Sequence, residues 1–200
     1  MRPIKRAEPD PSKFNPKAVL PYQLRRDDFR LAMQDVYDLF HDINASLVGR
    51  GLRRIEETVR PAILSGILSD ALSTSLARHA RVLTVNHYHN GHPDLIPEGL
   101  YPRDAVKAGE EGVEIKATKG RGAVDTHGAR AAWLCVFRYS VDSETEPAVE
   151  REATRIVEIL LARLDVDDFR RNPRSELGTR TASPNRDGIA KLRSNWIYRE

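Results

Sequence analysis

Residues 113–118, which read Val-Glu-Ile-Lys-Ala-Thr, place charged side chains inside a segment that otherwise has the composition of a buried strand. Successive side chains of a β-strand point to opposite faces of the sheet. Glu114 and Lys116 therefore share one face, and the other face carries the apolar side chains of Val113, Ile115 and Ala117. A chain with this pattern needs a sheet that packs on a core through one face and carries charged groups on the other.

A second short segment, residues 92–96, reads His-Pro-Asp-Leu-Ile and offers Asp94 beside two apolar residues. We expect both segments to form strands, with the carboxylates of Asp94 and Glu114 close together and Lys116 beside them. Two carboxylates suit Mg²⁺, which takes oxygen ligands and keeps several waters and substrate phosphate oxygens. A neighbouring lysine can orient or deprotonate an attacking water, or stabilise charge that develops on phosphorus. The pattern therefore predicts metal-dependent cleavage of a phosphodiester bond.

The order Pro-Asp followed by Glu-x-Lys on the next strand resembles the PD-(D/E)XK nuclease superfamily, which includes type II restriction endonucleases. The resemblance implies an α/β (α+β) fold with a mixed central sheet flanked by helices. It also implies a Mg²⁺-dependent endonuclease in which Asp94 and Glu114 hold the metal and Lys116 positions or activates water. A glutamate on a preceding helix often completes the site in that family, and Glu56 is the candidate for this catalytic and metal-binding role.

Glu56 belongs to a helical segment expected over residues 52–76, which Pro61 should kink or restart. It lies four residues after one apolar position and three before another, so it leans toward the apolar face of the helix. Glu57 falls on the wetter side of the same segment, and Asp70 lies further along it. These two carboxylates are the alternatives to Glu56.

Hydrophobic periodicity predicts most of the remaining elements. A helix over about residues 27–47 carries an apolar stripe at steps of three and four, which suits either the chain's own core or a second subunit. We also expect strands over residues 81–85, 133–139 and 196–198, and helices over residues 147–164 and 183–192.

Three histidines, His87, His89 and His92, flank the turn-forming pair Asn90-Gly91. Histidine is a common zinc ligand, but no cysteine lies nearby to complete a structural zinc site. We therefore expect a hairpin with mostly exposed imidazoles, one of which can contact a phosphate near Asp94.

Composition and charge divide the chain into three parts: a proline-rich, mobile or extended arm (residues 1–21), a nuclease-like core (residues 22–168) and a basic C-terminal extension (residues 169–200). From residue 170 onward, eight basic residues stand against three acidic ones, although the net charge of the chain is only +3. A concentration of basic residues attracts phosphate groups. Within the core, we expect Lys119, Arg121 and Arg130 to contact nucleic acid.

The chain has 40% hydrophobic residues and neither a membrane-spanning apolar run nor a signal-peptide pattern. Its one cysteine, Cys135, excludes an internal disulfide and lies in an apolar run, which favours a buried thiol in a cytoplasmic protein. We expect a homodimer that cuts double-stranded DNA, because cleavage of both strands calls for two sites related by a two-fold axis.

Other interpretations of the same residues stay open at this level. The chain could be a non-catalytic nucleic-acid-binding module, or a nuclease that acts on RNA or in DNA repair. A protein that uses the helix over residues 27–47 only for pairing is a third possibility. In either non-catalytic case Glu114 and Lys116 would form the solvent face of an edge strand.

Overall fold

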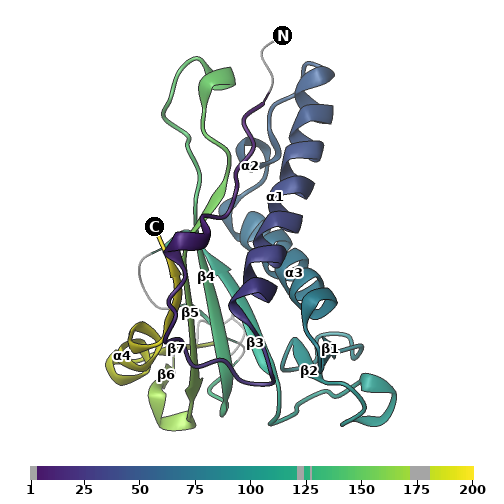
Figure 1. Cartoon of the computed structure of the whole chain (residues 1–200), viewed down its shortest axis with the longest axis vertical. Helices are drawn as coiled ribbons and strands as arrows, with labels where there is room; N and C mark the ends of the chain where they lie inside the picture. The colour runs from purple at the N-terminus through teal and green to yellow at the C-terminus, as the bar shows by residue number, and fades with distance from the viewer. Residues whose placement is uncertain (1–3, 121–123, 127, 172–180) are drawn as a thin grey trace, which may run out of the picture.

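The computed structural model describes residues 4–120, 124–126, 128–171 and 181–200. A six-stranded mixed sheet has the order β1-β2-β3-β4-β5-β8, and a separate pair of strands is formed by β6 and β7 (Figure 1). Only β3 and β4 run parallel to each other within the larger sheet. The strands are β1 (Leu83–Val85), β2 (Leu95–Pro97), β3 (Val113–Thr118), β4 (Ala132–Ser140), β5 (Arg155–Leu164), β6 (Phe169–Arg171), β7 (Ala182–Pro184) and β8 (Trp196–Arg199).

Helices cover both faces of the sheet, which confirms the expected α/β class (Figure 1). The long helices α1 and α3 lie side by side on one face, and α4 packs on the other face through Leu192. The helices are α1 (Arg26–Gly49), α2 (Ile55–Thr58), α3 (Pro61–His79) and α4 (Arg186–Ser194), with short 3-10 turns η1 (Pro11–Lys13), η2 (Pro102–Asp104), η3 (Ala148–Glu150) and η4 (Val166–Asp168). Within the described residues, no helix is both long and apolar enough to cross a bilayer.

Helix α1 begins where the sequence predicts, at a pair of acidic residues. Asp28 accepts a hydrogen bond from the Arg25 backbone N–H at 2.8 Å and pairs with the Arg25 guanidinium, which fixes the first turn. The first part of its apolar stripe packs in the chain's own core, where Phe29 and Met33 have no exposed surface, whereas Ile43 and Leu47 further along are only half-buried. Phe29 packs against Phe137 of β4, with 6.2 Å between ring centroids. The part of the stripe from Phe29 to Phe40 is therefore occupied by the chain's own core.

The helix predicted over residues 147–164 is wrong, because most of this segment is strand β5. Its apolar residues fit both a helix stripe and a strand that is covered on both faces, so periodicity alone does not separate the two. The tertiary context decides: β5 pairs with β4 over nearly its whole length on one side and with β8 on the other. Only η3 keeps a single helical turn, near Pro147.

The described part of the N-terminal arm and the end of the chain meet on β8. Phe14 is buried against Tyr198, with 4.9 Å between ring centroids, and the Asn15 backbone N–H donates to the Ile197 carbonyl. The helix expected over residues 183–192 is α4, which begins three residues later because residues 182–184 form β7; the side chain of Asn185 caps it by accepting from two backbone N–H groups. The expected terminal strand is β8, so the basic extension contributes an edge strand to the central sheet.

Candidate active site

The sheet opens between β2 and β3. These strands pair only at Leu95 and Val113, so the edge of β3 beyond that point has no strand partner. Two side chains satisfy its backbone donors instead: the Ile115 N–H donates to Asp94 Oδ2 at 2.7 Å and the Ala117 N–H donates to Ser69 Oγ at 2.8 Å. The Asp94 carboxylate is thereby fixed against β3 by a backbone hydrogen bond rather than by its own strand.

The alternation of β3 separates a packing face from a charged face, as the sequence predicts. Val113 and Ile115 are completely buried in the core beneath α1 and α3. Lys116 points the other way, and its Nζ lies 2.6 Å from Glu114 Oε1 and 4.0 Å from Asp94 Oδ2. The structure thus brings Asp94, Glu114 and Lys116 into one cluster.

Glu114 is the most enclosed member of this cluster, with only 9% of its side chain exposed. Its Oε2 lies 3.1 Å from His92 Nδ1. Its Oε1 is in ion-pair distance of Lys116, but the contact lacks the direction of a hydrogen bond and the atom accepts none from the described residues. A buried carboxylate oxygen held by charge alone retains capacity for another cationic partner.

The pKa values follow from this crowding. Burial, and then the charge of Glu114, raises the pKa of Asp94 to about 6. Burial also acts to raise the pKa of Glu114, but the His92 hydrogen bond and the charge of Lys116 outweigh it and leave this pKa below its ordinary value. Burial acts to lower the pKa of Lys116, and the two carboxylates reverse this effect, so that Lys116 stays protonated at neutral pH.

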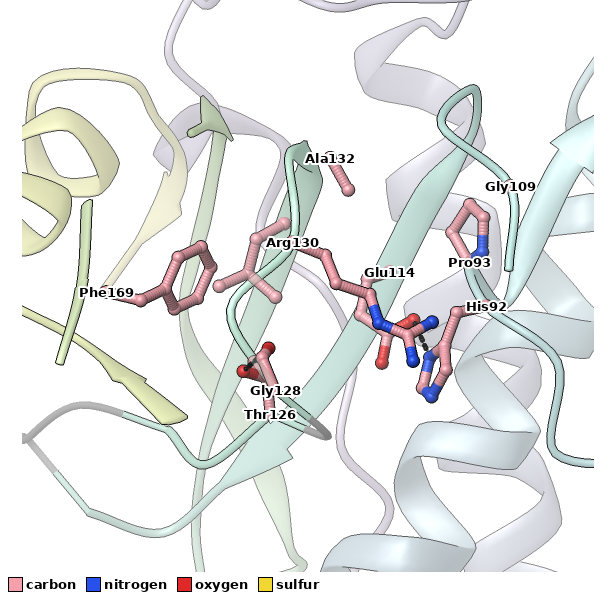
Figure 2. Close-up of a pocket in the computed structure, with 10 residues that line it drawn as sticks. His92, Pro93, Gly109, Glu114, Thr126, Gly128, Arg130, Ala132 and Phe169 are labelled. Carbon is pink, nitrogen blue, oxygen red and sulfur yellow. Dashed lines mark hydrogen bonds and ion pairs between the residues drawn. The ribbon is translucent and has the colours of Figure 1, made fainter. Parts of the chain in front are cut away.

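A small cavity of about 30 Å³ adjoins the cluster, lined by His92, Glu114, Thr126 and Arg130 among others, which is room for water or a small ion. Figure 2 shows the Arg130 side chain extending from the segment before β4 toward Glu114 and His92. Of the three basic residues expected to contact nucleic acid, Arg130 therefore reaches the cluster. Lys119 is exposed just beyond the end of β3, and Arg121 lies outside the described residues.

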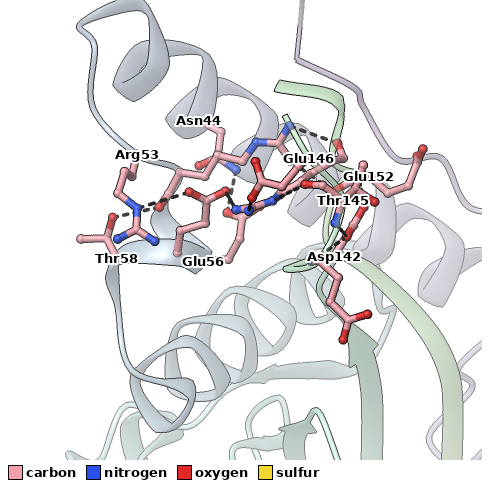
Figure 3. Close-up of polar contacts among 12 residues, drawn as sticks. Asn44, Arg53, Glu56, Thr58, Asp142, Thr145, Glu146 and Glu152 are labelled. Atoms are coloured by element: carbon pink, nitrogen blue, oxygen red, sulfur yellow. Dashed lines mark hydrogen bonds and ion pairs between the residues drawn. The ribbon is translucent and has the colours of Figure 1, made fainter. Parts of the chain in front are cut away.

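Glu56 does not join this cluster. Its carboxylate accepts a hydrogen bond from Asn44 Nδ2 at 2.8 Å, within a polar network that ties α2 to the loop at residues 142–152 (Figure 3). Helix α2 lies near the top of the molecule and β2 near the bottom (Figure 1). The expectation fails because Pro61 begins a separate helix, so that Glu56 and the residues that approach β3 belong to different elements.

The two alternative carboxylates, Glu57 and Asp70, lie in different parts of the structure. Glu57 binds Arg151 with an N–O distance of 2.7 Å, in the same network as Glu56. Asp70 lies on α3, next to Ser69, which touches the open edge of β3, and its charge helps to raise the pKa of Lys116. Of the helix carboxylates considered, Asp70 is thus the one whose charge acts on the cluster, and its side chain is exposed.

Two contributions were not predicted from the sequence: the contact of His92 with Glu114 and the capping of β3 by Ser69. His92 precedes Asp94 by two residues, and this closeness in the sequence is the one available signal. His87 and His89 are exposed, as expected. No three His, Cys, Asp or Glu side chains converge as metal ligands within the described ranges.

No known protein family matches this chain, and neither a curated protein nor a solved structure matches it significantly.

Proposed function

We propose that this protein is a Mg²⁺-dependent endonuclease that hydrolyses phosphodiester bonds in double-stranded DNA. The observation that carries the proposal is the convergence of Asp94, Glu114 and Lys116 at the open edge of β3, where both carboxylates lie within 4.0 Å of the lysine nitrogen. Two carboxylates and a protonated amine on one strand edge match the requirements of phosphoryl transfer, in which negative charge must be held and stabilised.

The residues present fit a hard divalent cation. Mg²⁺ is usually held by one or two carboxylates, with waters and substrate phosphate oxygens at its other positions, so a site of three protein ligands is not required. Burial and the charge of Glu114 raise the pKa of Asp94, and Glu114 Oε1 accepts no directed hydrogen bond from the described residues, so a cation bound by both carboxylates would stabilise their charge. Asp94 and Glu114 would hold the ion, which supplies Lewis acidity and a more acidic water.

We assign a role to each of the surrounding side chains from its contacts, its charge or its place at the cavity. Lys116, protonated between two carboxylates, orients the attacking water and stabilises the charge that develops on phosphorus. His92 holds the carboxylate of Glu114 in place. Arg130, which reaches into the cavity, binds a phosphate oxygen of the substrate. Asp70 takes the place proposed for the helix-borne carboxylate, since Glu56 is bound elsewhere.

Cleavage of both strands of a duplex calls for two copies of this site, and the proposed assembly is a homodimer. Its interface would not include the first part of the apolar stripe of α1, because Phe29, Met33, Val36 and Phe40 are buried within the chain. A dimer with a two-fold axis would present the two open β3 edges to opposite strands of the DNA.

The test is cleavage of supercoiled plasmid with Mg²⁺ and with EDTA, using Glu114→Gln and Lys116→Met beside the unaltered protein. Glu98→Gln is the matched control, because Glu98 is an exposed carboxylate just beyond β2. We expect Mg²⁺-dependent cleavage that falls by roughly 10²-fold or more in both site variants. The Glu98→Gln protein should cleave at the unaltered rate.

Cleavage that survives in both site variants would refute the assignment of the site. Binding of DNA without cleavage by the unaltered protein would instead favour a non-catalytic nucleic-acid-binding module. Repeating the assay with single- and double-stranded RNA separates a ribonuclease from a protein without nuclease activity.

A further inference from the structure

A second concave surface lies on the face of the sheet that carries α4. One hollow, of about 260 Å³, is lined by residues that include Thr118, Gly120 and Arg138. Another, of about 660 Å³, is lined by residues that include Arg170 and Arg186. Both are also lined by Ile189 and Arg193 of α4, so the two hollows adjoin along this helix, and we treat them as one concave surface. We refer to this surface as the α4 groove.

The α4 groove begins beside the candidate active site. Thr118 follows Lys116 by two residues on β3, so the two side chains share a face of the sheet. This is the charged face, opposite to the core beneath α1 and α3. From Thr118 the groove follows α4 to the β6–β7 pair, so its β3 end lies two residues along the strand from Lys116.

The groove is strongly basic. Arg170, Arg186 and Arg193 are exposed, and none of them has an ion-pair partner within the described part of the chain. The one acidic residue that lines the groove there is Glu158, and it is neutralised by Arg138 and Arg199, each at 2.9 Å. Three arginines thus face the groove without a carboxylate partner among its described lining residues.

We infer that the α4 groove binds the phosphate backbone of nucleic acid and guides it to the β3 edge. The arginine guanidinium is planar and donates two parallel hydrogen bonds to a phosphate, which suits a line of such side chains to a polyanionic strand. This inference rests on the proposed function only in taking nucleic acid as the polyanion that binds. The groove itself is defined by its arginines and not by the carboxylate cluster.

The test is the salt dependence of binding, measured by fluorescence anisotropy with a labelled 20-base-pair duplex. All proteins carry Glu114→Gln and the buffer contains EDTA, so that cleavage does not intervene. The groove variant is Arg170→Gln/Arg186→Gln/Arg193→Gln. The control variant is Arg26→Gln/Arg50→Gln/Arg60→Gln, which removes three exposed arginines from α1 and from the residues that cap α1 and α3. Both variants lower the net charge equally, and thermal melting checks that both are folded.

Each phosphate contact contributes about 0.9 to the slope of log K against log salt on duplex DNA. We therefore expect the slope of the groove variant to be shallower by about 2–3, while the control variant keeps the slope of the parent protein. Equal changes in both variants, an unchanged slope in the groove variant, or no binding by the parent would each overturn the inference. An absence of plasmid cleavage together with a groove-specific loss of slope would refute the nuclease proposal and leave the groove assignment standing.

Discussion

Replacement of Asp94 by asparagine should make the metal-free protein more stable at neutral pH, although it removes a proposed metal ligand. Asp94 is held beside Glu114, and burial together with this like charge raises its pKa to about 6. The folded state therefore disfavours the ionised carboxylate. An asparagine side chain has an oxygen that can accept the Ile115 N–H, as Asp94 does at 2.7 Å, and it carries no charge.

The magnitude follows from the pKa. A rise from 3.8 to about 6 corresponds to about 3 kcal/mol of free energy of unfolding as an upper bound. Nearly a third of the Asp94 side chain is exposed, and screening by water reduces this to roughly 1–2 kcal/mol. For a chain of this length such a difference shifts the melting temperature by roughly 2–8 °C.

The sign depends on pH. Because the folded-state pKa is the higher one, the unaltered protein loses stability as the pH rises from about 4 to about 6, and the loss is complete above that range. Thermal melts in EDTA should therefore show Asp94→Asn equal to the unaltered protein near pH 4 and more stable at pH 8. Added Mg²⁺ should raise the melting temperature of the unaltered protein and not that of the variant.

Asp142→Asn is the control with the opposite sign. Backbone hydrogen bonds from Glu152 and Thr145 hold the pKa of Asp142 well below its usual range, so loss of this charge should lower the melting temperature at pH 8. If Asp94→Asn melted at or below the unaltered protein at pH 8, the argument that burial and the charge of Glu114 disfavour the ionised Asp94 in the folded state would be refuted.

Two further predictions concern the scaffold. Arg151→Met leaves the enclosed Glu57 carboxylate, whose side chain is 8% exposed, without its 2.7 Å partner and should lower the midpoint of urea unfolding. Arg151→Met/Glu57→Gln should recover part of this loss, and an unaltered midpoint in the single variant would contradict the argument. Cys135 is completely buried, and burial raises the pKa of its thiol, so a thiol reagent should label it only at urea concentrations that unfold the chain. Rapid labelling in the absence of urea would show that β4 is not enclosed as described.

The local sequence pattern was enough to predict those elements whose structure does not depend on the segments that pack against them. The stripe of α1 and the alternation of β3 hold in any packing, because each leaves one apolar face to be buried. The capping of α4 by Asn185 is equally local. These three features account for much of the fold class and for the common face of Glu114 and Lys116.

The wrong or missing predictions concern segments whose structure or contacts depend on distant parts of the chain. The apolar run of β5 fits a helix until β4 and β8 are placed on either side of it. Glu56 and Asp70 are equally plausible on an isolated helix, and the break at Pro61 together with the approach of α3 to β3 separates them. The contact between His92 and Glu114 spans 22 residues and depends on how β2 diverges from β3.

The two edge strands of the central sheet are protected from further strand pairing in different ways. The outer strand on one side, β1, has three residues and offers little backbone on which another chain could add itself. On the other side, β8 receives the chain's own beginning, through the bridge between Phe14 and Tyr198 and the hydrogen bond from Asn15 to Ile197. The segment around residue 14 thus occupies the edge of β8 and blocks pairing with a strand of a neighbouring molecule.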